Sequence, residues 1–187
     1  DPNGQSQGVR YPCGYVARID PATGEWDYHS VGYRNPYDIA FDAGGELFTY
    51  DSDMEWDIGL PWYRPTRFLH AVPGGDYGWR PGSGVLPEHC FDVLPAALEA
   101  GRGSPTGLAF CESDAFPARY RGALFAGDWG EGEILAFFPR PDGASYRGEL
   151  ETVLRTSSGL SVTDLAFGPG GDLYFVSGGR GTLDRKS

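Results

Sequence analysis

Three stretches of this chain repeat one pattern of apolar and polar positions. They begin at Tyr37, Thr106 and Thr163 and read YDIAFDAGGELFTYD, TGLAFCESDAFPARYRGALFAGD and TDLAFGPGGDLYFVSG. In each copy an Ile-Ala-Phe or Leu-Ala-Phe segment is joined, through a turn with glycine, to a segment that begins Leu-Phe or Leu-Tyr. A strand, a turn and a strand that recur after several tens of residues are typical of propeller blades. The chain is therefore predicted to be all-β, a β-propeller of four-stranded antiparallel blades.

The segments between the repeats predict the remaining strands. Alternating apolar and polar residues favour strands over 14–20, 25–29, 67–72, 132–138 and 151–154. Together they give about two nearly full blades and two partial ones, in a propeller domain over 14–183 between a flexible lead-in at 1–13 and a tail at 184–187. A propeller hides its sheet edges by closing its last blade on its first. We therefore expect that missing blades come from another chain or that copies of this chain associate.

Charge and composition narrow the function classes. The chain has 15 Lys and Arg against 26 Asp and Glu, a formal net charge of -11 at pH 7. Contacts to phosphates need a basic surface, so nucleic acid is not an expected partner. The sequence has no apolar run long enough to predict a membrane span. Cys13, Cys90 and Cys111 are compatible with one disulfide and a free thiol, or with three thiols.

An acidic segment follows the first repeat. It contains four alternating carboxylates, those of Asp51, Asp53, Glu55 and Asp57. In an extended strand they would share one face, where a bound cation would relieve their mutual repulsion. Carboxylate oxygens suit Ca²⁺, so the segment is a candidate calcium site, although Trp56 stands where an EF-hand loop needs glycine. The alternative is an exposed acidic strand end or loop without a metal.

Arg34 and Asn35 stand in a loop before the first repeat, because the Asn-Pro pair after Arg34 favours a turn. An arginine placed there can hold a carboxylate, a quinone oxygen or a phosphate through two hydrogen bonds. The alternative is a structural salt bridge from Arg34 to the acidic segment.

The ends of the repeats supply further candidates. Asp128 and Trp129 follow the second repeat and Arg180 follows the third, at places that correspond to Asp51 in the first. If the inner strands run toward one end of the propeller tunnel, these strand ends converge on one rim. Trp79 stands in a glycine-rich loop, where it favours a sugar subsite or plain packing over a blade. Trp79, Asp128 and Trp129 are therefore the predicted substrate rim.

Several phrases, read in order, carry a family resemblance. GYRNPYDIAF, SPTGLAF, FPARYRGALFAGDWGEGEI, SVTDLAFGPGGDLYF and GGRGT resemble the propeller domain of glucose/sorbosone dehydrogenase-like proteins, and among these the membrane-bound dehydrogenase domains of planctomycete type. The resemblance implies part of a six-bladed, periplasmic or secreted propeller that oxidises sugars or aldehydes with pyrroloquinoline quinone (PQQ) and calcium. It matches Arg34 to the arginine that contacts the quinone, and the dehydrogenase hypothesis adds Asn35 and Arg180 as cofactor-binding candidates. It also assigns Asp51, Asp53 and Glu55 to the calcium region.

The chain also departs from that family. The histidine base of the family lies upstream of the Arg-Asn motif, and nothing before Arg34 supplies it, so no catalytic residue is identified. Ser52 and Asp53 stand where the family's calcium loop has Gly-Pro. Two alternatives therefore stay open, a non-catalytic propeller module that binds carbohydrate or protein, and a partial propeller that associates with itself.

Overall fold

The structure, a computed structural model, describes residues 13–81, 84–87, 89–155 and 160–178. These residues form an all-β fold with two short 3-10 helices, η1 (Glu55–Asp57) and η2 (Ala118–Tyr120), which confirms the predicted class. No helix within the described ranges is long and apolar enough to cross a membrane. The predicted lead-in before Cys13, the tail and Arg180 lie outside the described residues.

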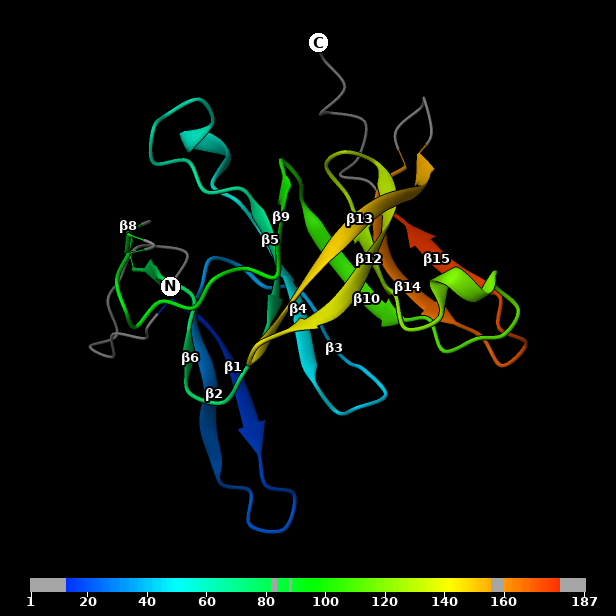
Figure 1. Cartoon of the computed structure of the whole chain (residues 1–187), viewed down its shortest axis with the longest axis horizontal. Coiled ribbons are helices and arrows are strands. Elements are labelled where there is room, and N and C mark those ends of the chain that lie inside the picture. The colour runs from blue at the N-terminus through cyan, green and yellow to red at the C-terminus, as the bar shows by residue number, and fades with distance from the viewer. Residues whose placement is uncertain (1–12, 82–83, 88, 156–159, 179–187) are drawn as a thin grey trace.

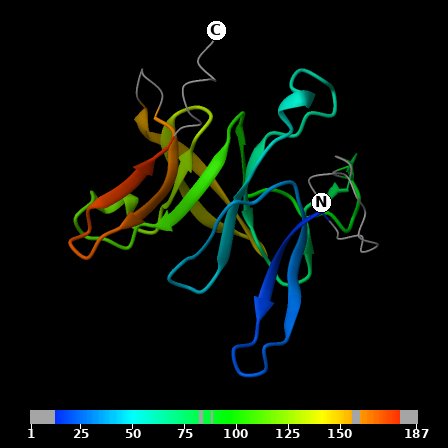
Figure 2. The same ribbon diagram turned by 180° about the vertical axis from the view of Figure 1, so that it is seen from behind.

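The strands form sheets that follow one another along the chain (Figures 1 and 2). The first sheet holds β1 (Gly14–Ile19), β2 (Trp26–Tyr33) and β6 (Gly75–Asp76), and the second holds β3 (Ile39–Phe41), β4 (Leu47–Asp51), β5 (Thr66–His70) and β9 (Leu98–Gly101). The next holds β10 (Pro105–Phe110), β11 (Leu124–Asp128), β12 (Glu133–Asp142) and β13 (Ser145–Arg155), and the last pairs β14 (Val162–Phe167) with β15 (Leu173–Ser177). A separate hairpin joins β7 (Trp79–Arg80) to β8 (Gly84–Val85).

The three repeats form the antiparallel hairpins β3–β4, β10–β11 and β14–β15. The first strands of these hairpins lie side by side, since β10 contacts both β3 and β14. The Leu108 amide donates to the Asp38 carboxylate at 2.8 Å, and the Thr106 hydroxyl donates to the Val162 carbonyl at 2.9 Å. Within the described residues the sheets do not close into a ring.

The two four-stranded sheets pack face to face through the apolar face of their central strands, which are buried on both faces. On β4 and β5, Phe48, Tyr50 and Phe68 face the neighbouring sheet of β10–β13 and pack there against Leu124 and Phe137. The rings of Tyr50 and Phe68 stack with centroids 4.3 Å apart, and those of Phe68 and Phe137 with centroids 4.8 Å apart. Side chains that alternate along a strand point to opposite faces, so the intervening residues build the next core.

The opposite faces form two more cores. Leu47 and Leu69 pack against Val16, Tyr33 and Tyr77 beneath the first sheet. A third core lies between the sheet of β10–β13 and the β14–β15 hairpin, and it contains Cys111, Phe125, Ile134, Ala136, Val162 and Leu165. Cys13, Cys90 and Cys111 are all free thiols. Each sheet therefore packs against its neighbour.

Gly107 tests the contact between neighbouring inner strands. A Cβ at this residue would lie 2.8 Å from the Cα of Asp164 in β14 and would also meet the Asp164 carboxylate. We expect Gly107→Ala to lower the free energy of unfolding by about 1–3 kcal/mol, because the strands must move apart. Urea denaturation measures this change. Gly170→Ala is the matched control, since its new Cβ would meet only the Asp172 carboxylate, at 3.7 Å. Equal effects of the two substitutions would contradict the close approach of β10 and β14.

Candidate functional site

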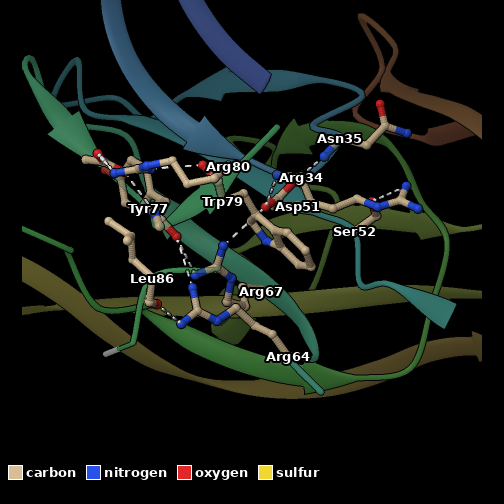
Figure 3. Close-up of polar contacts among 12 residues, drawn as sticks. Arg34, Asn35, Asp51, Ser52, Arg64, Arg67, Tyr77, Trp79, Arg80 and Leu86 are labelled. Atoms are coloured by element: carbon tan, nitrogen blue, oxygen red, sulfur yellow. Dashed lines mark hydrogen bonds and ion pairs between the residues drawn. The ribbon is translucent and has the colours of Figure 1, made fainter. Parts of the chain in front are cut away.

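Asp51 ends strand β4 and organises the loop that precedes β3 (Figure 3). Its carboxylate is fully buried and accepts hydrogen bonds from the backbone amides of Arg34, at 2.9 and 3.1 Å, and of Asn35, at 2.8 Å. The guanidinium of Arg67, its register partner on β5, donates to the same carboxylate at 3.3 Å. Burial raises the pKa of Asp51, and the Arg67 charge and the two amides oppose that rise. The carboxylate is therefore held by the protein itself.

This arrangement leaves the Arg34 side chain loosely held. Its guanidinium lies 3.4 Å from the Ser52 hydroxyl and 3.4 Å from the Glu55 carboxylate, and 3.6 Å from the Met54 sulfur. These distances are long for charge-assisted hydrogen bonds. The Asn35 side chain points away from Asp51 in Figure 3. The backbone of the Arg34 loop is thus fixed, while the guanidinium is able to take a better acceptor.

The acidic segment is extended only at its start. Strand β4 ends at Asp51, and Glu55–Asp57 form the 3-10 helix η1, so the carboxylates do not share one face. Asp51 turns inward to Arg67. No group of three or more His, Cys, Asp or Glu side chains is placed to hold a metal ion in the described part of the chain. The condition for one shared face, an extended strand, is therefore not met, because a turn of 3-10 helix follows the strand.

Asp53 and Glu55 instead line a pocket between two neighbouring sheets. The pocket has a volume of about 260 Å³ and lies among the loops that follow β4, precede β10 and follow β11. Its other lining residues are Ile58, Arg102, Gly103, Ser104, Trp129, Gly130 and Glu131. Carboxylates, an arginine and a tryptophan therefore meet in one concave site, a combination typical of small polar ligands.

Asp53 is the most unusual group in this pocket. The side chain is almost fully buried; its Oδ2 accepts a hydrogen bond from the Tyr63 hydroxyl at 2.6 Å, and its Oδ1 has no hydrogen-bond partner. Burial raises the pKa of Asp53, the Glu55 charge adds to the rise, and the Tyr63 hydrogen bond opposes it. A buried carboxylate oxygen without a donor is costly, so a cation or a donor placed here would be stabilising.

Asp128 occupies the place in β11 that Asp51 occupies in β4. Its Oδ1 accepts hydrogen bonds from the amides of Ser104, Gly130 and Glu131 at 2.9–3.0 Å, and its Oδ2 accepts one from the Tyr50 hydroxyl at 3.2 Å. The carboxylate is buried and does not line the pocket, but it fixes the loops that do through these backbone hydrogen bonds. Trp129, which follows it, lines the pocket and donates from its indole nitrogen to the Gly178 carbonyl at 3.0 Å.

The structure separates the remaining predicted site residues. Trp79 is 1% exposed in β7 and does not line the pocket that contains Trp129. Asp57 is half-buried in η1 and is not a lining residue either. The site residues that sequence reasoning missed are Arg67, Arg102 and Glu131. Only Arg67 had a signal in the sequence, because a charged residue inside the apolar strand TRFLH needs a buried partner.

The comparisons with known proteins agree on the fold. No protein-family model and no curated protein matches the sequence. A glucose dehydrogenase-type oxidoreductase from Thermus thermophilus is 25% identical with a TM-score of 0.65, and the match covers 84% of this chain and 44% of that protein. The PQQ-bound form of an aldose sugar dehydrogenase from Streptomyces coelicolor is 18% identical with a TM-score of 0.59, over 84% of this chain and 41% of that one.

The soluble aldose sugar dehydrogenase of Escherichia coli, in its apo-form, is similar at 20% identity and a TM-score of 0.60, over 80% of this chain and 43% of that enzyme. The chain thus has the all-β fold of the propeller sugar dehydrogenases. It resembles the glucose and aldose sugar dehydrogenases and spans less than half of their length, which confirms the resemblance predicted from the motifs and its partial extent.

Asp51→Asn tests the organising role of Asp51. The substitution removes the charge opposite buried Arg67 and turns amide hydrogens toward the Arg34 and Asn35 amides. We expect a loss of about 3–5 kcal/mol in the free energy of unfolding, the usual cost of an uncompensated buried charge. Asp27→Asn is the control, because Asp27 pairs with Arg18 at the exposed surface, where a pair contributes about 0–1 kcal/mol. Chemical denaturation of both variants measures the difference, and similar losses would refute the assigned role.

Proposed function

We propose that this chain forms part of a quinone-dependent sugar or aldehyde dehydrogenase-like propeller and carries a section of its cofactor and substrate rim. One observation carries the proposal: Asp51 fixes the Arg34–Asn35 loop beside a pocket of carboxylates, an arginine and Trp129, in a chain with the fold of the sugar dehydrogenases. On this basis we assign residues to three roles: contact with the quinone, binding of a cation and contact with the substrate. The family resemblance favours a periplasmic or secreted location.

Arg34 suits an anionic quinone. PQQ carries carboxylates and quinone oxygens, and a guanidinium pairs with such groups through two hydrogen bonds. The Arg34 guanidinium has only long contacts to its own neighbours, so its donors can turn to the cofactor without the loss of a strong bond. Asn35 follows in the same fixed loop, and Arg180 is proposed as a second cationic contact from a stretch outside the described residues. When bound, the quinone would accept the hydride of the substrate.

Calcium is proposed at Asp53 and Glu55. The pocket holds three carboxylates, from Asp53, Glu55 and Glu131, which repel an anionic cofactor unless a cation lies between them. The unpartnered Oδ1 of Asp53 supplies an oxygen ligand that the protein does not otherwise use. Asp51 does not fit a ligand role, since amides and Arg67 already occupy its oxygens. The remaining calcium ligands would be oxygens other than those of Asp51, including those of the cofactor.

The proposed division of labour leaves proton transfer to another part of the protein. His29 bonds the Ala71 carbonyl at 2.9 Å, His70 bonds the Glu46 carboxylate at 2.7 Å, and His89 is exposed; none of the three lines the pocket. The histidine base that the resemblance implies is therefore proposed to come from propeller segments beyond this chain. Trp129 and Asp128 would then shape the substrate rim, Trp129 with its ring and Asp128 through the loop amides that it holds.

A non-catalytic module that binds carbohydrate is the second candidate. It is favoured by the same pocket, which combines Trp129 with carboxylates and contains no histidine among its lining residues. The open sheets favour a related role in assembly. Trp26 on β2 and Phe41 on β3 are exposed at 53% and 61%, and Tyr174 on β15 at 62%. We propose that missing blades, from another chain or a second copy, cover these residues.

Calorimetric titration of metal-free protein with Ca²⁺ and then PQQ tests the proposed function. We expect both to bind, and Arg34→Ala to weaken quinone binding by roughly tenfold or more, because a charge-assisted pair contributes about 1.5–3 kcal/mol. Arg18→Ala is the control, since Arg18 is an exposed arginine of β1. Glycan binding without any quinone binding would favour the non-catalytic module. Quinone binding that is unchanged in Arg34→Ala would remove Arg34 from the cofactor site.

Asp53→Asn tests the calcium proposal through stability. The pKa of Asp53 is raised in the folded state, so the folded protein binds the proton of this carboxyl group more tightly than the unfolded chain does. The ionised carboxylate therefore lowers the stability of the fold at neutral pH. We expect Asp53→Asn to raise the free energy of unfolding of metal-free protein at pH 7, and this gain to shrink as the pH falls from the folded pKa toward the lower unfolded pKa. Thermal melts at several pH values measure both effects.

Added Ca²⁺ should make the wild type more stable than Asp53→Asn, the reverse of their order without metal. The wild type is expected to gain stability with Ca²⁺ concentration, as any ligand of the folded state produces, whereas Asp53→Asn should not respond. Asp57→Asn is the matched control, because Asp57 lies in the same acidic segment and does not line the pocket. An equal response of all three proteins to Ca²⁺ would place the metal elsewhere or show that none binds.

A further inference from the structure

A second cavity is lined by Arg67, the residue that pairs with Asp51. It has a volume of about 450 Å³ and shares no lining residue with the pocket of Asp53. Its polar part is formed by Arg64, which precedes β5, by Arg67 of β5 and by Glu99 of β9. Its apolar part is formed by Val93, Leu94, Pro95 and Ala96. A cavity with an apolar wall and a few charged groups is the usual form of a small-ligand site.

The two arginines are held rigidly in this cavity. Both are buried, and both guanidinium groups donate to the Tyr77 carbonyl, Arg64 at 3.2 Å and Arg67 at 3.1 Å (Figure 3). Arg64 also donates to the Leu86 carbonyl at 3.1 Å. Gly78 has a φ of +92°, and a Cβ there would lie 2.8 Å from the Arg64 guanidinium, so the close approach requires glycine. The cationic groups are therefore preorganised before any ligand arrives.

Arg67 retains a donor that nothing in the described structure accepts. Its terminal nitrogens bond the Tyr77 carbonyl and the Asp51 carboxylate, whereas its Nε–H is buried without a hydrogen-bond partner. The indole N–H of Trp79, another residue of the same region in Figure 3, is also buried and unpartnered. An unsatisfied buried donor costs about 1–3 kcal/mol, so an acceptor delivered to this cavity would recover part of that cost.

The other lining residues decide which acceptor fits. The apolar residues 93–96 favour a ligand with a short hydrocarbon part next to its acceptor group. Glu99, which is exposed on β9, adds a negative charge that disfavours an ion with two or more charges. We propose that this cavity binds a small organic monocarboxylate, with the carboxylate on Arg67 and the hydrocarbon part against residues 93–96. The site is separate from the proposed quinone pocket and does not depend on it.

Isothermal titration with acetate, butyrate and inorganic phosphate, at constant ionic strength, tests the proposal. The full chain should bind butyrate in a saturable manner and more tightly than acetate by several-fold, since butyrate buries two more methylene groups. Phosphate should bind more weakly than either. Absence of saturable butyrate binding, or phosphate binding as tight as that of butyrate, would overturn the proposal.

Two variants locate the bound carboxylate. Glu99→Gln removes the repelling charge at an exposed position, so butyrate should bind several-fold more tightly. Arg67→Lys keeps the positive charge opposite Asp51 and removes the Nε–H, so butyrate binding should weaken at least tenfold. Arg18→Lys, at an exposed arginine, is the control.

The fold of each variant is checked by circular dichroism before titration. If Arg67→Lys does not fold, the response of Glu99→Gln decides. Unchanged or weaker butyrate binding in Glu99→Gln places the ligand outside this cavity and refutes the proposal. PQQ binding, measured separately, is expected to be unaffected by Glu99→Gln, so this test stands apart from that of the proposed function.

Discussion

The buried pair of Asp51 and Arg67 is the contact on which the surrounding structure depends. The two residues are register partners on β4 and β5, so both side chains point to the same face of the sheet. A buried pair is stable only when its remaining donors and acceptors are satisfied. Here the Arg34 and Asn35 amides complete the carboxylate and the Tyr77 carbonyl takes another guanidinium donor, which leaves the Arg67 Nε–H as the one donor of the pair without a partner among the described residues. One ion pair thereby connects the sheet, the Arg34 loop and the segment between β5 and β9 that contains Tyr77.

The same solution recurs in the neighbouring sheet with different partners. Asp128 ends β11 as Asp51 ends β4, and it holds the Ser104 amide before β10 together with the amides of Gly130 and Glu131. In the third hairpin Ser177 takes that position. A carboxylate at this place in the repeat therefore serves to hold the loops around the strand ends. The groups left to meet a ligand are the neighbours, Asp53 and Trp129, which line the pocket between the two sheets.

The pocket and the second cavity share one physical basis. In each, a buried polar atom lacks a partner, Asp53 Oδ1 in the first and Arg67 Nε in the second. In each, the groups around it are fixed by hydrogen bonds to main-chain atoms or by burial. The signs differ, since the first site needs a cation or a donor and the second an acceptor. The ligands proposed for the two cavities therefore differ in charge, and the cavities share no lining residue.

The local pattern of the sequence alone determined the strands and the hairpins of the three repeats, because alternation along a strand decides which side chains face a core. It also selected Arg34, Asp53, Glu55 and Trp129, which lie at or beside the pocket. Only the tertiary structure decided that Asp51 turns inward, that the acidic segment breaks into a 3-10 helix and that Trp79 is buried. The position of Asp51, for example, depends on Arg67 and on the backbone amides of Arg34 and Asn35. Strand pairing and sheet packing set these contacts, and no local pattern of residues encodes them.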